Sequence, residues 1–224
     1  MFFGSARALP PEAAKENLRK VQARLRRETT PELRHAESRA KRTVEMSRYY
    51  AAAAALAEKL TRWSMALPKA GNRFVICSGG GPGIMEAANR GAANAGGLSI
   101  GLNISLPMEQ YPNPYLTRDL SFEFHYFFMR KFWFVYLARA LVVFPGGFGT
   151  FDELFTLLTL VQTGKTSRTV PVILYGSRYW KDIVDFDAMV KWGVIKPADL
   201  DLFRFFDDVD SAFQYLKKVL TPHQ

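Results

Sequence analysis

The sequence contains few of the residues that build disulfides or metal sites. It has one cysteine, Cys77, so no disulfide can form within the chain, and a reducing cytoplasm is the expected location. The three histidines (His35, His125 and His223) are scattered, and no His, Cys or carboxylate spacing indicates a metal. No apolar run is long enough to span a bilayer, and no signal peptide is recognisable. We therefore expect no metal, no other cofactor and no membrane partner.

The composition does not require a second domain. Of the 224 residues, 48% are hydrophobic, and eighteen phenylalanines and four tryptophans can supply a sizeable core. The chain has no internal repeat, and a short alanine run is its only low-complexity tract. We expect one domain over residues 1–224, with a helical arm over residues 10–67 within it.

Basic charge is concentrated in one segment of this arm. The net charge is +9, and Lys15–Arg42 holds ten Lys and Arg residues against four Glu residues, which gives 10 − 4 = +6. Such a cluster can attract nucleic acid. However, no RNA-binding module is recognisable, and no aromatic residues interleave with the basic ones. We therefore favour a solvated helix face with some acid–base pairs at helical spacing, such as Glu28 with Arg24. Nucleic acid remains the alternative partner.

Apolar strand-like runs alternate with amphipathic helices along the chain. This alternation predicts an α/β fold, a Rossmann-like, doubly wound and mainly parallel sheet. The helical region Pro10–Leu67, broken around Thr29–Pro31, is expected to cover one face of the sheet. A first strand at Met1–Phe3 either begins at the initiator or continues upstream. Further strands are predicted at Arg73–Cys77, Leu98–Leu102, Leu120–Phe124, Ala140–Phe144, Val170–Tyr175 and Phe203–Phe206, and further helices at Ile84–Ala95, Tyr126–Arg139, Phe151–Val161, Trp180–Trp192 and Asp210–Leu220.

A glycine-rich turn, Pro145-Gly146-Gly147-Phe148-Gly149-Thr150, joins a predicted buried strand to a helix. Glycines let the backbone approach a ligand closely, and the free N–H groups and dipole of the helix favour an anion. Thr150 is expected to cap the helix and to offer its hydroxyl to a phosphate. Glu153 is expected in the first helical turn, facing whatever the turn binds. The pattern predicts a phosphate cradle beside a carboxylate.

A second glycine turn, Ser78–Gly83, belongs to a predicted strand–turn–helix–strand unit. Its glycines do not fit the dinucleotide pattern G-x-G-x-x-G, and Asn103 and Ser105 stand where that motif requires an acid. No Lys-Ser/Thr pair follows the glycines, so the turn is not a Walker A loop. The sequence therefore argues against NAD binding and against ATP hydrolysis.

Three segments in this order, Ser78–Ala87, Arg130-Lys131 and Pro145–Glu153, resemble the lonely-guy (LOG) family. Its members are nucleoside 5′-monophosphate phosphoribohydrolases that are often labelled lysine decarboxylases. The resemblance extends over most of the chain, from Phe3–Arg7 to the last helix. Phe124–Phe128 looks more like the larger bacterial members than the plant cytokinin-activating type. Decarboxylation would require a Schiff-base lysine for pyridoxal phosphate, and nothing around Lys131 suggests one.

The resemblance implies hydrolysis of the N-glycosidic bond of a purine nucleoside 5′-monophosphate, either AMP-like or a cytokinin riboside phosphate. The products would be the free base and ribose 5-phosphate, and the oxocarbenium-like transition state would gain from a carboxylate. Arg130 and Glu153 are the implied catalytic residues. A homodimer or larger homo-oligomer, with Tyr126–Tyr136 suited to the interface, is also implied. The implied substrate- and phosphate-binding residues are Gly80, Gly81, Glu86, Lys131, Gly146, Gly147, Gly149 and Thr150.

Alternative interpretations remain open for these residues. Glu153 could only complement a helix N-terminus, which is worth ~0.3–1 kcal/mol. Arg130 and Lys131 could form a solvated helix edge, and Glu86 could equally compensate a helix dipole or contact a ribose. The chain could also be a non-catalytic carrier of a nucleotide or a phosphorylated cofactor. A carrier requires the glycine cradle but not the carboxylate, so the Arg130–Glu153 pair favours the enzyme.

Overall fold

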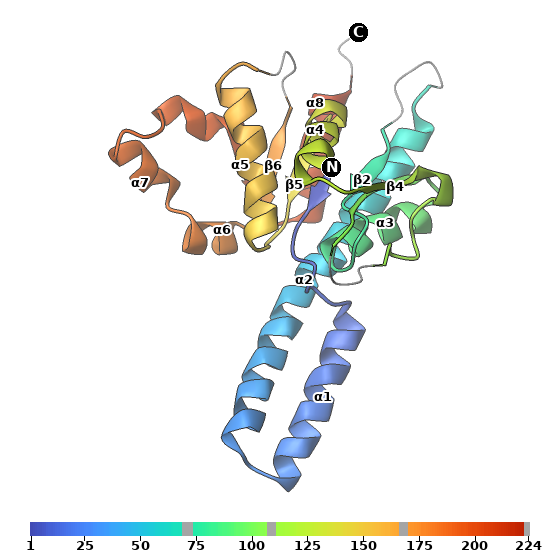
Figure 1. The fold of residues 1–224 in the computed structure, drawn as a ribbon, viewed down its shortest axis with the longest axis vertical. Helices are drawn as coiled ribbons and strands as arrows, with labels where there is room; N and C mark the ends of the chain where they lie inside the picture. Colours follow the sequence, from blue (N-terminus) through green and yellow to red (C-terminus); the bar gives the residue numbers. More distant parts are fainter. Residues whose placement is uncertain (69–73, 107–110, 166–169, 222–224) are drawn as a thin grey trace.

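The computed structural model describes residues 1–68, 74–106, 111–165 and 170–221 (Figure 1). Its strands form one parallel sheet in the order β4-β3-β2-β1-β5-β6-β7, which confirms the predicted Rossmann-like class. The strands are β1 (Phe2–Phe3), β2 (Ile76–Ser78), β3 (Ser99–Ile104), β4 (Ser121–Phe124), β5 (Leu141–Val143), β6 (Val172–Tyr175) and β7 (Phe203–Phe206). The α-helices are α1 (Pro11–Arg27), α2 (Pro31–Ala66), α3 (Ile84–Asn94), α4 (Phe127–Leu137), α5 (Phe148–Gln162), α6 (Ser177–Ile183), α7 (Phe186–Lys191) and α8 (Val209–Leu220), and η1 (Arg118–Leu120) and η2 (Pro197–Leu202) are short 3-10 turns.

The short strand β1 lies at the centre of the sheet, between β2 and β5. Phe2 pairs with Ser78 on one side and with Val142 on the other. From β1 the chain runs outward through β2, β3 and β4, and it then crosses to the other side of β1 to form β5. Ligands of such sheets bind beyond the carboxyl ends of the strands, where the strand order reverses. Both glycine turns leave the sheet at this reversal, one from β2 and one from β5.

Alternation along the central strands divides the core into two layers. Phe2 and Val142 face a layer formed by α2, α3 and α8, whereas Phe3 and Val143 face a layer formed by α4, α5 and α6. The first layer also buries Tyr50, Leu56, Ile84 and Leu216, and the second also buries Phe134, Leu154 and Trp180. The sheet is therefore covered on both faces, and its carboxyl-terminal edge is left for a site.

The arm over residues 10–67 does not lie on the sheet along its whole length. α1 and the first half of α2 project from the domain as an antiparallel hairpin (Figure 1), and the α2 residues of the core begin only at Tyr49. The prediction that the whole arm covers a sheet face was therefore wrong. The predicted break is confirmed, because the Thr30 hydroxyl accepts a hydrogen bond from the Leu33 amide and begins α2. Among the described residues, no helix is long and apolar enough to cross a membrane.

Two predicted helices differ from the structure by more than two residues at an end or are divided. The predicted helix Trp180–Trp192 is interrupted, because the Asp185 carboxylate accepts a hydrogen bond from the Ala188 amide and starts α7 after α6 has ended. The helix predicted from Phe151 begins instead at Phe148, inside the glycine turn. Arg73, the predicted first residue of its strand, lies outside the described residues.

We expect Gly91→Ala to destabilise the fold, because α2 and α3 pack without space for a side chain there. A Cβ on Gly91 would lie 2.1 Å from the Ala54 carbonyl oxygen and 2.9 Å from the Ala57 Cβ. The free energy of unfolding should fall by about 1–3 kcal/mol, although alanine is the better helix former. Urea unfolding followed by circular dichroism measures the change. The control Ala93→Ser, on the exposed side of α3, should stay within about 0.5 kcal/mol of wild type. A Gly91→Ala protein as stable as wild type would contradict the close packing.

Candidate active site

A cavity of about 830 Å³ opens at the carboxyl-terminal edge of the sheet. Its wall is built by the loop after β1, by the turn between β5 and α5, and by the first half of α4. Residues distant in the sequence therefore meet where the strand order reverses. The lining includes Ser5, Arg7, Gly79, Met85, Phe127, Arg130, Gly146, Gly147, Phe148, Gly149, Thr150, Glu153 and Tyr179.

Glu153 is a buried carboxyl in the wall of this cavity. Only 7% of its side chain is exposed, and burial raises its pKa to about 7, although the nearby Arg130 charge opposes the shift. Because α5 begins at Phe148, Glu153 lies in the second helical turn and not in the predicted first turn. It is therefore too far along the helix to serve mainly as a compensating charge for the N-terminus. A carboxyl with a pKa near neutrality can accept or donate a proton under physiological conditions.

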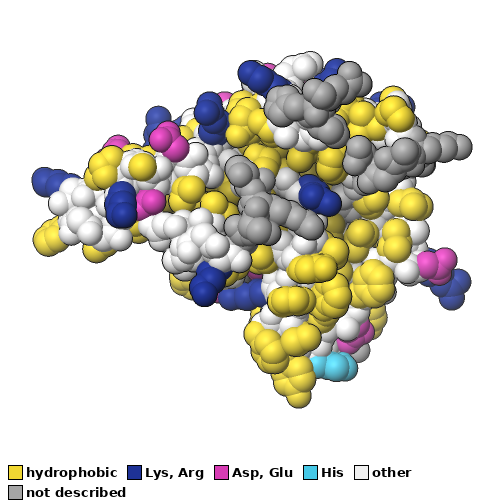
Figure 2. All heavy atoms as spheres, turned by 90° about the horizontal axis from the view of Figure 1, so that it is seen from above, with side chains coloured by type: hydrophobic (Ala, Val, Ile, Leu, Met, Phe, Trp, Pro, Cys, Tyr) yellow, Lys and Arg dark blue, Asp and Glu magenta, His cyan; other side chains and the backbone are white. Residues whose placement is uncertain are grey.

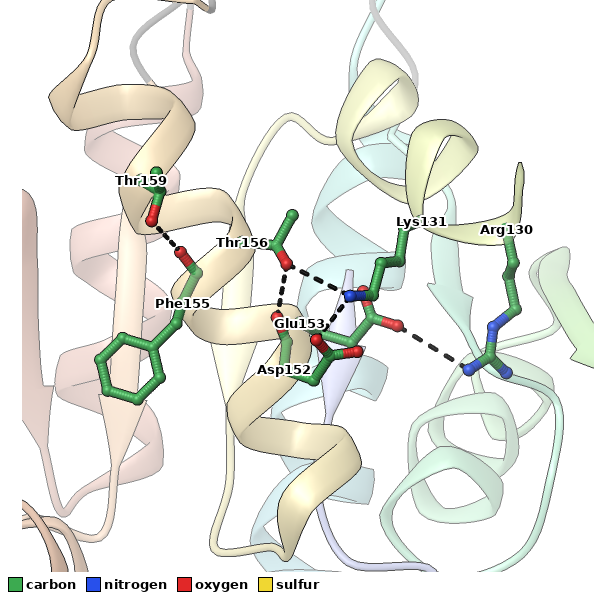
Figure 3. Close-up of polar contacts among 7 residues, drawn as sticks. All are labelled: Arg130, Lys131, Asp152, Glu153, Phe155, Thr156 and Thr159. Atoms are coloured by element: carbon green, nitrogen blue, oxygen red, sulfur yellow. Dashed lines mark hydrogen bonds and ion pairs between the residues drawn. The ribbon is translucent and has the colours of Figure 1, made fainter. Parts of the chain in front are cut away.

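Arg130 reaches Glu153 from α4, on the opposite wall (Figure 3). Its Nη2 lies 3.8 Å from Glu153 Oε1, and its guanidinium lies 5.4 Å from the centres of both the Phe127 and Phe134 rings. Burial in these apolar surroundings lowers the pKa of Arg130. Its Nε is buried and has no acceptor among the described residues. The site therefore holds a desolvated cation with an unused hydrogen-bond donor, which a ligand oxygen or nitrogen could satisfy.

Lys131, the next residue of α4, does not line the cavity but points toward Asp152 and Thr156 of α5 (Figure 3). Its ammonium lies 2.5 Å from the Asp152 carboxylate and donates to the Thr156 hydroxyl at 3.5 Å. Asp152 is half-exposed, so the ion pair lies at the surface. Lys131 thus links α4 to α5 beside the Arg130–Glu153 pair and helps to keep the two helices in register. Its predicted contact with substrate stays a prediction.

The turn between β5 and α5 packs against other residues of the protein on one side and is free of side-chain contacts on the other. A Cβ on Gly146 would lie 2.1 Å from Thr150 Oγ1, and Tyr179 Oη donates to the Gly146 carbonyl oxygen at 2.5 Å. Gly147 and Gly149, in contrast, have no atom within 4 Å of the place where a Cβ would lie. The turn is therefore held from behind and offers two bare glycine backbones to the cavity.

Gly147, and not Thr150, is the N-cap of α5. The Thr150 amide donates to the Gly147 carbonyl oxygen at 2.9 Å, so Thr150 is already the third residue of the helix, and the predicted cap was wrong. Its buried side chain still lines the cavity. The first N–H groups of a helix have no acceptor within the helix, and together with the helix dipole they suit an anion. Phe148, between the two glycines, is 97% exposed at the rim.

The other glycine turn faces mainly into the protein. The Asn113 side-chain amide donates to the carbonyl oxygens of Gly80 (2.9 Å) and Gly81 (3.1 Å). Gly80 has φ +73°, and a Cβ there would collide with Asn103 at 2.1 Å. The first amide of α3, on Ile84, donates to the Ser5 carbonyl oxygen and so is already used. Gly79 alone of this turn's glycines lines the cavity, so the predicted contacts of Gly80 and Gly81 with substrate stay predictions.

Glu86 also lies outside the cavity lining. Its Oε1 accepts a hydrogen bond of 2.6 Å from Tyr50 Oη, which joins α3 to α2, and burial together with this carboxylate raises the pKa of Tyr50. Its predicted role in substrate binding stays a prediction, and the contact observed is structural.

Six of the ten predicted site residues line one cavity: Arg130, Glu153, Gly146, Gly147, Gly149 and Thr150. Sequence reasoning gave no role to Ser5, Arg7 or Tyr179, nor to Asn113 behind the second turn. The signal for Ser5 and Arg7 was their position directly after the first strand, at the edge where both glycine turns lie. Asn113 stands between two prolines, and no sequence pattern connected it to Gly80. Together the lining residues can bind an anion, offer a cation and exchange a proton.

The proteins that match this chain in sequence and those that match it in structure bear different names. A model of the family described as possible lysine decarboxylase matches residues 85–216. The pyrimidine/purine nucleotide 5′-monophosphate nucleosidase of Escherichia coli (strain K12) is 33% identical over 161 residues, which are 64% of this chain and 33% of that protein. This chain thus spans about a third of the length of that relative.

Two solved structures resemble the fold. One is the molybdenum cofactor binding protein of Rippkaea orientalis, with a TM-score of 0.55 and 18% identity over 77% of this chain and 88% of that one. The other is the molybdenum cofactor carrier protein of Chlamydomonas reinhardtii, with a TM-score of 0.54 and 21% identity over 78% and 89%. At such identities the similarity is one of fold alone.

We expect the burial of Glu153 to make stability depend on pH. The folded pKa of about 7 lies above the ordinary value of 4.5, so wild type loses stability as the pH rises from 4.5 to 7, by up to about 3 kcal/mol. The Glu153→Gln variant has no carboxyl at this position and therefore does not lose this stability as the pH rises. Its free energy of unfolding relative to wild type should therefore increase between about pH 5 and pH 8, as measured by urea unfolding.

Asp152→Asn is the matched control, because it removes the neighbouring half-exposed carboxylate, which solvent already screens. It should give a clearly smaller change with pH. An equal change in the two variants, or none in Glu153→Gln, would mean that burial does not perturb Glu153.

Proposed function

The chain belongs to the family described as possible lysine decarboxylase, the LOG family, and from this membership we propose that it hydrolyses the N-glycosidic bond of a nucleoside 5′-monophosphate. The products are the free base and ribose 5-phosphate. The observation that carries the proposal is the buried Glu153 carboxyl facing the Arg130 guanidinium in a cavity whose wall includes a glycine-flanked helix N-terminus. The E. coli relative bears the name of a nucleosidase for such nucleotides.

The 5′-phosphate binds at the start of α5. The open backbones of Gly147 and Gly149 let phosphate oxygens approach the first N–H groups of the helix, and the Thr150 hydroxyl lies on the same wall. Arg7 lines the cavity and adds a positive charge at its opening. With the phosphate held here, the ribose extends toward Glu153, farther along α5.

Glu153 and Arg130 then act on the glycosidic bond. As the bond from the base nitrogen to the ribose C1′ breaks, its electron pair leaves with the base, and the ribose becomes oxocarbenium-like. The ionised Glu153 stabilises this positive charge and takes a proton from the water whose oxygen bonds to C1′. Glu153 then releases this proton, which binds to the electron pair on the base nitrogen. Arg130 binds the phosphate or the departing base through its unused donor.

A purine base, as in AMP or a cytokinin nucleotide, is the proposed leaving group. The cavity supports a base of this size, since its lining also includes the apolar side chains of Met85, Phe127 and Phe148. Aromatic side chains can stack on any base. The printed name of the E. coli relative includes pyrimidine as well as purine nucleotides, so both classes belong in a substrate panel.

Decarboxylation through pyridoxal phosphate receives no support from the cavity. None of the described residues that line it is a lysine, and Lys131 is paired with Asp152 of α5. A Schiff base needs a lysine that faces the substrate. The family description therefore does not fit the side chains of this site.

The second candidate is a carrier of a nucleotide or phosphorylated cofactor. The names of the two solved structures favour it, although they share only the fold with this chain. A carrier needs the α5 cradle but gains nothing from a buried carboxyl that costs stability. Glu153 therefore supports the hydrolase.

The assembly we propose is a homodimer or larger homo-oligomer formed through α4. The exposed large side chains of α4 include Phe128 (67%), Tyr136 (61%) and Phe132 (55%). Figure 2, which views the molecule from the end opposite the hairpin, shows a group of hydrophobic side chains that protrudes from one side. Aromatic residues are enriched in interfaces.

The location that we propose is the cytoplasm, where a free, buried cysteine such as Cys77 stays reduced.

Incubation with a panel of purine and pyrimidine 5′-monophosphates, with free base and ribose 5-phosphate quantified by chromatography, tests the reaction. Wild type should release base, and Glu153→Gln should lose at least about a hundredfold in kcat while still binding the nucleotide, because only the transition state needs the charge. Asp152→Asn should lose clearly less than Glu153→Gln, because Asp152 does not line the cavity and acts only through its ion pair with Lys131. Binding of nucleotides by wild type with no base release from any of them would contradict the hydrolase and favour the carrier.

The pH dependence of kcat/KM tests the role of Glu153. Because the ionised carboxyl is the active form, kcat/KM should rise about tenfold per pH unit below the Glu153 pKa of about 7 and become constant above it. A rate that falls as the pH rises through 7 would instead assign Glu153 the role of a proton donor and contradict this mechanism.

A further inference from the structure

The helical hairpin of α1 and the first half of α2 extends from the same edge of the sheet as the cavity but contributes nothing to the cavity lining (Figure 1). It also lies outside the segment that matches the family model, which begins at residue 85. Within residues 11–48 no large hydrophobic side chain is exposed. Protein interfaces need an apolar core, so the exposed surface of the hairpin is unsuited to hydrophobic docking.

The basic charge of the hairpin is mostly not neutralised. Of its ten Lys and Arg residues between Lys15 and Arg42, only Lys20 and Lys41 form ion pairs among the described residues, with Glu16 and Glu37. The pair expected between Glu28 and Arg24 is absent from the described ion pairs. The reason is that Glu28 is the extended C-cap of α1 (φ −146°), so helical i, i+4 spacing no longer applies. The predicted solvated face with some pairs at helical spacing is therefore confirmed by Lys20–Glu16 and Lys41–Glu37, whereas the Glu28–Arg24 example was wrong.

Several of these cations lie on one face of the hairpin, at helical spacing. Lys15, Arg19 and Arg26 follow one another at i, i+4 and i+11 along one flank of α1, a row of about 16 Å. On α2, Arg34 and Lys41 stand at i and i+7. All five are exposed, and all but Lys41 are without an ion pair among the described residues. We call this set the basic face.

A contact between the two helices brings these rows together. Gln22 lies in the α1 row between Arg19 and Arg26, and its side-chain amide donates to Glu37 Oε1. Glu37 in turn pairs with Lys41 in the α2 row. The two rows therefore flank this contact on the same side of the hairpin, separated by the distance of packed helices, about 8–10 Å.

From this arrangement we infer that the basic face is a docking surface for the phosphate backbone of a double-stranded nucleic acid. Two rigid rows of cations match a duplex, whose phosphates run in rows along the edges of its grooves. A hairpin is too wide to enter a groove as a single helix does, and the face carries no aromatic side chain to stack on bases. Binding is therefore independent of sequence and weakens with salt. This inference does not depend on the proposed hydrolase activity.

Fluorescence anisotropy with a labelled duplex DNA of about 20 base pairs, between about 50 and 300 mM salt, tests the inference. The triple variant Arg19→Gln, Arg26→Gln, Arg34→Gln preserves helix propensity and removes three charges from the basic face. It should bind at least about tenfold more weakly than wild type at about 100 mM salt, and its plot of log affinity against log salt should be shallower by about 2–3.

The charge-matched control is Lys191→Gln, Lys217→Gln, Lys218→Gln, which removes three exposed charges from α7 and α8. It should change the affinity less than about twofold, since screening confines each charge to its surroundings. Equal weakening in both triple variants would reduce the effect to net charge and overturn the inference. A wild-type protein that does not bind the duplex at about 50 mM salt would also overturn the inference. If that protein binds polyglutamate, an acidic protein is the partner instead.

Discussion

The site depends on the burial of one carboxyl, Glu153, opposite one guanidinium, Arg130. Their atoms are 3.8 Å apart, so the attraction offsets only part of the cost of removing both charges from water. The raised pKa of Glu153 and the lowered pKa of Arg130 both result from this incompletely offset cost of desolvation. A pair kept for stability alone would be closer or more exposed. In this pair each charge is only partly compensated by the other, so each can still interact with a charged group of a substrate.

The fold maintains this unfavourable arrangement from both sides. Glu153 is fixed by α5, whose start is held at Gly146 by Tyr179, and Arg130 is fixed by α4, which Lys131 links to α5 through Asp152. The central strand β1 is short, and the chain after it passes between the two glycine turns, where Ser5 bonds to Pro145 and Ile84. The reversal of strand order thus brings an anion site and a tuned carboxyl into one cavity.

Much of this could be read from the sequence, because glycine turns after apolar strands have a defined geometry. The class of fold, the turn at Gly146–Thr150 and the position of Arg130 and Glu153 in one site were predicted. The start of α5 at Phe148 was not, since glycines usually end the helical pattern in a sequence. The contact of Asn113 with Gly80 joins distant residues and has no local signal. The projection of the hairpin could not be foreseen either, because an amphipathic helix has the same periodicity whether it packs on a sheet or on another helix.

The direct test of the central claim is the titration of the Glu153 carboxyl by ¹³C NMR, with its resonance assigned by its loss in Glu153→Gln. The account predicts a midpoint near 7, because burial outweighs the attraction of Arg130. A midpoint at the ordinary value of 4.5 would contradict it, because the carboxyl would then be solvated and no longer tuned for proton transfer near neutral pH.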